Sequence, residues 1–101
     1  MPEPTLGRTV LYRLSEYDAQ AINKRRKDAY NSASYANNTG VITHVGNQAE
    51  EGQQVPAVIV RVWQGGVVNL QCQLDGNDVY WATSRKEGDE GNCWAWPEVV
   101  Q

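Results

Sequence analysis

The sequence predicts a single α+β domain, in which an N-terminal strand and helix precede a strongly bent antiparallel β-meander or small barrel. Three observations predict this fold. The length of 101 residues suits one domain. One early segment carries apolar residues at helical spacing, and the later segments alternate polar and apolar residues between Gly- and Asn-rich turns. We therefore divide the chain into a flexible tail, residues 1–7, and one domain, residues 8–101.

The first strand is expected over residues 9–14, where β-branched and aromatic residues alternate roughly with polar ones. The helix is expected over residues 15–33. Ser15 is the predicted N-cap, and Asp18 stands three positions later, which resembles a capping box. The apolar residues of the helix form one narrow face of mostly small side chains, namely Ala19, Ile22, Ala29, Tyr30 and Ala33.

The β-meander follows a loop at residues 37–40, which are Asn-Asn-Thr-Gly. A short strand is expected at residues 41–45. The three strongest strand candidates are residues 55–63, 67–74 and 78–84. A last short strand, interrupted by Pro97, is expected within residues 93–100.

The turns predict which strand faces form the core. The turn at residues 75–78 places Leu74 opposite Val79, and a three-residue loop with Gly66 in the left-handed conformation places Val62 opposite Val68. The predicted core face then consists of Val58, Val60, Val62, Val68, Leu70, Cys72, Leu74, Val79 and Trp81. The predicted second face consists of Ala57, Ile59, Arg61, Trp63, Asn69, Gln71, Gln73, Tyr80, Ala82 and Ser84.

The predicted second face is rich in side-chain amides and carries one arginine. It has two interpretations. It is either the ordinary solvent face of an antiparallel sheet, which is commonly polar, or a recognition surface. Adjacent rows of amides favour fixed hydrogen bonds to a polar ligand or to a second copy of the chain.

Two further sets of residues also have two interpretations each. Arg26 falls on the apolar side of the helix, where it either covers the edge of the core or meets an anion or carboxylate through its planar guanidinium. Trp94 and Trp96 share one face near the C-terminus. They form either an aromatic cluster that closes one end of the fold or a stacking platform for a base.

Composition argues against several classes of protein. A net charge of −3 is unsuited to duplex nucleic acid. Two cysteines and one histidine, His44, are too few for a structural zinc site, so we expect neither a metal nor a cofactor. We find no nucleophile, phosphate-loop or metalloprotease motif and expect no enzyme. The N-terminus lacks the features of a signal peptide, and no segment is apolar enough to span a membrane, so we expect a cytoplasmic location.

The chain resembles a family of short proteins encoded by tailed bacteriophages. The resemblance covers most of the chain from Gly7 onward, and five segments carry it: GRTVLY at residues 7–12, DAQAINKRR at 18–26, HVGN at 44–47, DGNDVYWATS at 75–84 and WAWP at 94–97. The resemblance implies a phage genome and the cytoplasm of a bacterial host, and it implies no particular activity.

By analogy with other small phage proteins, our leading hypothesis is a counter-defence protein that sequesters a nucleotide-type immune signal as a homo-oligomer. Arg61 and Arg26 would neutralise phosphate, while Asn69, Gln71, Gln73 and Ser84 would bond to base or ribose. Tyr80, Trp94 or Trp96 would stack on the base. The alternatives are a protein-interaction inhibitor of a host enzyme that uses the same face, and a single-strand nucleic-acid-binding accessory protein.

Overall fold

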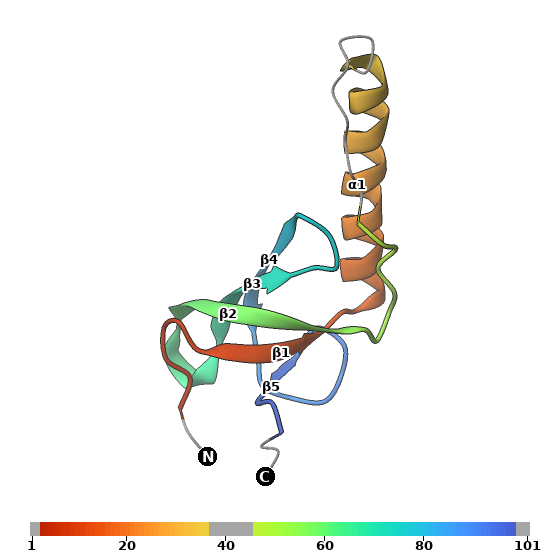
Figure 1. Cartoon of the computed structure of the whole chain (residues 1–101). Helices are drawn as coiled ribbons and strands as arrows, with labels where there is room; N and C mark the ends of the chain where they lie inside the picture. Colours follow the sequence, from red (N-terminus) through yellow and green to blue (C-terminus); the bar gives the residue numbers. More distant parts are fainter. Residues whose placement is uncertain (1–2, 37–45, 99–101) are drawn as a thin grey trace.

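One long helix and a five-stranded sheet make up the protein in a computed structural model, which describes residues 3–36 and 46–98. The elements follow in the order β1 (Thr9–Arg13), α1 (Glu16–Ala36), β2 (Gln54–Val62), a 3₁₀ turn (Gln64–Gly66), β3 (Val68–Gln73), β4 (Val79–Arg85) and β5 (Trp94–Ala95). Figure 1 shows the meander β2–β3–β4 with β1 beside β2.

The α+β class is confirmed. The strand order is β4-β3-β2-β1-β5, and all four neighbouring pairs are antiparallel. Of the two expected forms, the sheet takes the open one and does not close into a barrel. The predicted strand at residues 41–45, with His44, lies outside the described residues.

Helix α1 begins as its sequence predicts. The Asp18 amide donates to Ser15 Oγ at 3.1 Å, and the Ser15 amide donates to Asp18 Oδ2 at 2.9 Å, so the capping box is confirmed. Ala19 and Ile22 of the first turns are buried against the sheet. The rest of α1 projects away from the strands (Figure 1), which leaves the sheet to form most of the core.

The first hairpin confirms the predicted loop but not the predicted face of β2. The Trp63 amide donates to the Val67 carbonyl at 2.7 Å, Gly66 has a φ of 78°, and Val62 pairs with Val68, all as expected. A β-bulge then adds one residue to β2, because Ile59 pairs with Leu70 while Arg61 pairs with Asn69.

The bulge reverses the side-chain alternation over the preceding part of β2. Ala57 and Ile59 are buried, while Val58 is half-buried and Val60 is 40% exposed. The predicted pairs Val60–Leu70 and Val58–Cys72 were therefore wrong. Val60 was also predicted to lie in the core, and it lies at the surface instead.

The second hairpin is one residue out of the predicted register. Gln73, rather than Leu74, pairs with Val79, so the connection takes five residues instead of four. A one-residue slip moves every side chain of a strand to the other face. Val79 and Trp81 are consequently 49% and 63% exposed, and Ala82 is buried in their place.

The face of β3 was predicted correctly, since Val68, Leu70, Cys72 and Leu74 are all buried. We call the side that carries these residues the inner face of the sheet. The remaining core residues come from the strands, from α1 and from the segment before β2: Val10, Tyr12, Leu14, Ala19, Ile22, Ala49, Val55, Ala57, Ile59, Ala82 and Trp94.

Candidate functional site

The opposite side of the sheet, which we call the outer face, is the candidate site. Strand pairing places Val58, Gln71 and Trp81 in one row across β2, β3 and β4, with Gln73 and Val79 paired in another row. The outer face comprises Val58, Val60, Arg61, Gln71, Gln73, Val79, Trp81 and Thr83.

The outer face is apolar at positions where a solvent face would carry charge. Trp81 is 63% exposed and Val79 49% exposed. Single exposed apolar residues are common on protein surfaces, but here Val60 of β2 and Val79 and Trp81 of β4 are exposed on the same face, on the two strands that flank β3. The polar side chains between them are the uncharged amides of Gln71 and Gln73. Such a composition is typical of an interaction surface.

One corner of the outer face is held rigid by Asn69. The Trp63 indole N–H donates to Asn69 Oδ1 at 2.9 Å, and the Ser84 amide donates to the same oxygen at 2.8 Å. Asn69 is only 7% exposed. Its side chain therefore ties Trp63, the residue after β2, to the irregular end of β4, where Ser84 adopts a φ of 58°.

The Arg61 guanidinium lies over the Trp63 ring, with 4.1 Å between Arg61 Cζ and the ring centroid. A cation stacked on an indole face loses less conformational freedom on binding a partner than a free arginine would lose. Arg61 is exposed, so the stack presents one pre-oriented positive charge at the edge of the outer face.

The structure brings together four of the predicted site residues, Arg61, Asn69, Gln71 and Gln73, on or beside the outer face. Ser84 reaches this corner through its backbone amide. Three apolar residues of the outer face, half-buried Val58 and exposed Val79 and Trp81, were missed, because the predicted register assigned them to the core. Arg26, Tyr80, Trp94 and Trp96 lie elsewhere in the molecule.

Arg26 is 7% exposed, and its guanidinium is hydrogen-bonded within the protein. Of the two interpretations from the sequence, it therefore follows the one in which Arg26 meets a carboxylate. Its Nε and Nη2 donate to the two oxygens of Asp78, each at 2.9 Å, and Nη1 donates to the Asn47 carbonyl. The hydrogen bonds from Arg26, which are the largest cause, and from Arg25 lower the pKa of Asp78 to about 2. The hydrogen bonds that Asp78 accepts from Arg26 raise the pKa of Arg26.

Gly46 and Gly76 make room for the Arg26 guanidinium. A Cβ at Gly76 would lie 3.0 Å from Arg26 Nη2 and 2.8 Å from the Gly46 Cα, and a Cβ at Gly46 would lie 2.7 Å from the same nitrogen. Both residues therefore need to be glycine. Asn47 adds a bond from its side chain to Asp75 Oδ2 at 2.8 Å. This set of residues, the Arg26 clasp, joins α1 to the β3–β4 turn.

Tyr80 lies on the inner side, in a cluster around Asp18. Asp18 is fully buried and accepts hydrogen bonds from the Tyr12 hydroxyl at 2.5 Å and the Tyr80 hydroxyl at 2.8 Å, with Arg85 Nη2 at 3.5 Å. Burial alone would raise the pKa of Asp18, but these bonds and those from Ser15 outweigh it and lower the pKa. Burial and the bond to Asp18 raise the pKa of Tyr80 to about 12.

Trp94 and Trp96 form an aromatic cluster at the end of the core. Their ring centroids lie 5.3 Å apart with a perpendicular orientation, and Arg8 Cζ lies 5.1 Å from the Trp96 ring. Trp94 is fully buried. Its ring is therefore not open to a base. The two tryptophans pack as an aromatic cluster, which is the first of the two interpretations offered by the sequence.

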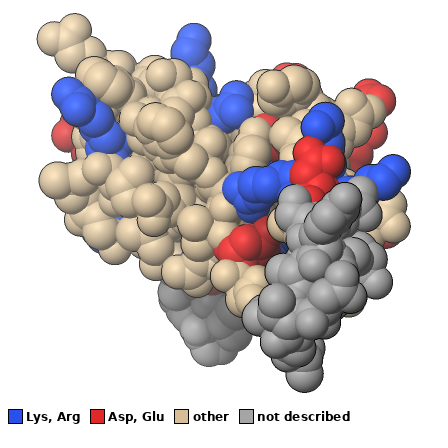
Figure 2. Space-filling model, turned by 90° about the horizontal axis from the view of Figure 1, so that it is seen from above, with Lys and Arg blue, Asp and Glu red and all other residues tan. Residues whose placement is uncertain are grey.

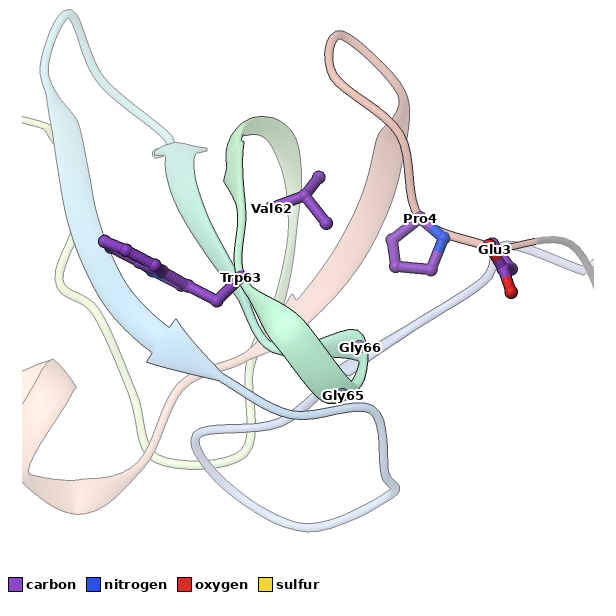
Figure 3. A pocket seen from close by; sticks show the side chains of 6 residues that line it. All are labelled: Glu3, Pro4, Val62, Trp63, Gly65 and Gly66. Atoms are coloured by element: carbon purple, nitrogen blue, oxygen red, sulfur yellow. The ribbon is translucent and has the colours of Figure 1, made fainter.

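A cavity of about 350 Å³ lies away from the outer face, where the N-terminal segment meets the β2–β3 turn. Figure 3 shows Glu3 and Pro4 on one side of this cavity and Gly65 and Gly66 on the other, with the Trp63 ring directed away from the N-terminal segment. The cavity carries the carboxylate of Glu3 and has no cation in its lining, so it is unsuited to a phosphate.

The remaining chemistry of the described residues is sparse. Within residues 3–36 and 46–98, no group of three His, Cys, Asp or Glu side chains could hold a metal ion. Cys72 and Cys93 are free thiols, and burial raises the pKa of Cys72 to about 12, so its thiol stays protonated. No helix in this part of the chain combines the length and apolarity that crossing a membrane requires.

Charged side chains of both signs lie next to one another beside α1, as Figure 2 shows. Three of the four basic residues of α1 are paired with acidic ones. Lys24 contacts Asp28 at 2.8 Å, and Arg25 and Arg26 contact Asp78 at 3.1 Å and 2.9 Å. The described surface in this view has no broad basic patch of the kind that binds a nucleic-acid backbone.

No protein-family model matches the chain, and neither a curated protein nor a solved structure shows significant similarity to it.

Proposed function

We propose that this protein is a non-catalytic, protein-binding module, and that it docks a host bacterial protein on the outer face during phage infection. One observation carries the proposal: the outer face bears no charge except Arg61 and exposes apolar side chains on β2 and β4, of which the largest, Trp81, is 63% exposed. In this role the protein would act in the host cytoplasm and would inhibit a host enzyme by binding to it.

The shape and composition of the outer face favour a protein over a small molecule. Pockets for small ligands are concave and bury about 70–90% of the ligand surface. Protein interfaces are flatter, and tryptophan and arginine dominate their binding energy. The outer face offers Trp81 on β4 and Arg61 on β2, with the amides of β3 between these strands and valines beside them that can exclude water.

The chemistry of the face also describes its partner. Arg61 is the one permanent charge of the outer face, so the partner should place a carboxylate opposite it. Gln71 and Gln73 each present a donor and an acceptor, so the partner should offer polar backbone or amide groups to them. Elsewhere its contact surface should be apolar and uncharged.

Capture of a nucleotide-type signal remains the second candidate, and one observation favours it. The Arg61 guanidinium is held 4.1 Å above the Trp63 ring, beside an amide-rich surface, which suits a phosphate. The outer face carries a single cation, which would hold a nucleotide weakly, so we rank this candidate below protein binding.

The test compares two valines of β2 that are equally exposed but lie on opposite faces. Val60 and Val62 are each 40% exposed, yet Val60 stands on the outer face and Val62 pairs with buried Val68 beside the Glu3 cavity. Immobilised wild-type protein, Val60→Lys and Val62→Lys are incubated with a bacterial lysate, and retained proteins and small molecules are identified by mass spectrometry. We expect one host protein that Val62→Lys retains and that Val60→Lys binds at least about tenfold more weakly.

Equal retention by the two variants would refute docking on the outer face. Retention of a nucleotide instead of a protein would favour the second candidate. Both variants should show wild-type circular dichroism, because neither position is in the core.

A further inference from the structure

Strand β4 (Val79–Arg85) is an edge of the sheet, and its free side has no strand beside it among the described residues. The other edge is β5, which has only two residues and is followed by Pro97. Short edge strands and prolines are common protections against unwanted strand pairing. β4 is long by comparison and contains no proline.

Asp78 and Arg85, the charged residues nearest to the two ends of β4, are engaged inside the protein and do not protect its edge. Asp78, just before the strand, is bound by Arg26 and Arg25. Arg85, at the end of the strand, turns toward Asp18 and the Tyr12 ring. Between them, Val79–Thr83 is free of charged residues and precedes the irregularity at Ser84. An uncharged edge of β-branched and aromatic residues is suited to pairing with another strand.

We propose that two copies of this chain pair antiparallel through β4, about a two-fold axis that passes beside Trp81. The axis places Trp81 of one copy opposite Trp81 of the other, and Val79 opposite Thr83 of the second copy. These pairs keep each side chain on its own face, as a two-fold axis normal to the sheet requires. Aromatic pairs and pairs of β-branched residues are favourable across antiparallel strands.

The sequence of β4 supports a second copy as the occupant. Its residues Val79–Thr83 are uncharged, so antiparallel pairing of two copies about Trp81 brings no like charges opposite each other. The strand is therefore complementary to itself.

Pairing through β4 joins the two sheets edge to edge and makes their outer faces continuous. The proposal does not depend on the proposed function, because it uses the strand edge and needs no host protein. It names the interface of the homo-oligomer that the sequence predicts.

The test is a disulfide cross-link at the two-fold axis. Cys93→Ser removes the accessible native thiol, while Cys72 is fully buried. In that background, Trp81→Cys places two thiols directly opposite each other, at a Cα separation of about 5 Å that a disulfide can span. The matched control is Thr83→Cys, whose two copies would lie about 13 Å apart along the strands, which is too far.

We expect mild oxidation to convert Trp81→Cys to a covalent dimer and to leave Thr83→Cys uncoupled. Light scattering of the unmodified protein should give twice 11.3 kDa at micromolar concentration. Both positions are exposed, so circular dichroism should confirm that both variants fold. A monomer at every concentration, or equal cross-linking at both positions, would overturn the proposal. Because Val60→Lys should still dimerise, failure of this test is distinguishable from failure of docking.

Discussion

Replacing Asp18 by alanine is expected to destabilise the protein by about 3–5 kcal/mol, because the buried partners of its carboxylate would be left unpaired. Asp18 is fully buried and joins the start of α1 to β1 and β4 through Tyr12, Tyr80 and Arg85. A domain of this size is stable by about 5–15 kcal/mol in total, so much of the native population would be lost on warming. Urea unfolding monitored by circular dichroism measures the change.

The control for Asp18 is Asp28→Ala, which removes an exposed carboxylate that pairs with Lys24 on the same helix and should leave the urea midpoint nearly unchanged. The effect should also depend on pH. Since the folded pKa of Asp18 is lowered, its stabilisation is present above the unfolded value of about 3.9 and is lost as pH falls through the folded pKa. An Asp18→Ala variant as stable as the wild type at pH 7 would contradict this assignment.

Replacing Arg26 by alanine should have a similarly large effect, again about 3–5 kcal/mol, because it breaks the Arg26 clasp. The change removes two bonds to Asp78 and one to the Asn47 carbonyl, and it leaves a gap between Gly46 and Gly76. A double-mutant cycle with Asp78→Ala should show strong coupling, because the two residues form one interaction.

The matched control is Arg25→Ala. Arg25 also contacts Asp78, at 3.1 Å, but its side chain is 46% exposed, so its removal should cost less than about 1 kcal/mol. Asp78 has a pKa of about 2, and its stabilisation is therefore present above pH 4 or so and is lost as pH falls toward 2. Equal losses for Arg25→Ala and Arg26→Ala would show that the clasp is not the stabilising contact.

Much of the fold was predictable because its signals are local. The capping box at Ser15 and Asp18, the left-handed Gly66 and the bounds of the central strands all follow from short stretches of sequence. The face of β3 followed as well, since apolar residues alternate with Asn69, Gln71 and Gln73 in its sequence.

The faces of β2 and β4 were not predictable, because long-range contacts set them. In β2, the indole of Trp63 and the amide of Ser84 both bond to Asn69, and the bulge lies opposite this residue. In the β3–β4 turn, Asp78 is drawn to Arg26 of the helix, and the connection takes five residues instead of four. Local turn rules contain neither partner, so they give a register one residue away from the observed one.

The candidate site was predicted only in part, because the same long-range contacts decide which of its residues are exposed. Arg61, Gln71 and Gln73 lie on β3 or on the C-terminal side of the β2 bulge, where the predicted faces hold. Trp81 was assigned to the core, since a tryptophan on an alternating strand is usually buried. Its exposure follows only from the one-residue slip of the second hairpin.

The most direct test of docking on the outer face is site-specific photo-cross-linking in bacteria that express the protein. A photoreactive amino acid is placed at Gln71, between Val58 and Trp81 in the row across the sheet, or at Tyr17, which is 74% exposed on α1. We expect position 71 to cross-link one host protein and position 17 to cross-link none. Cross-links to that host protein from position 17 but not from position 71 would contradict docking on the outer face.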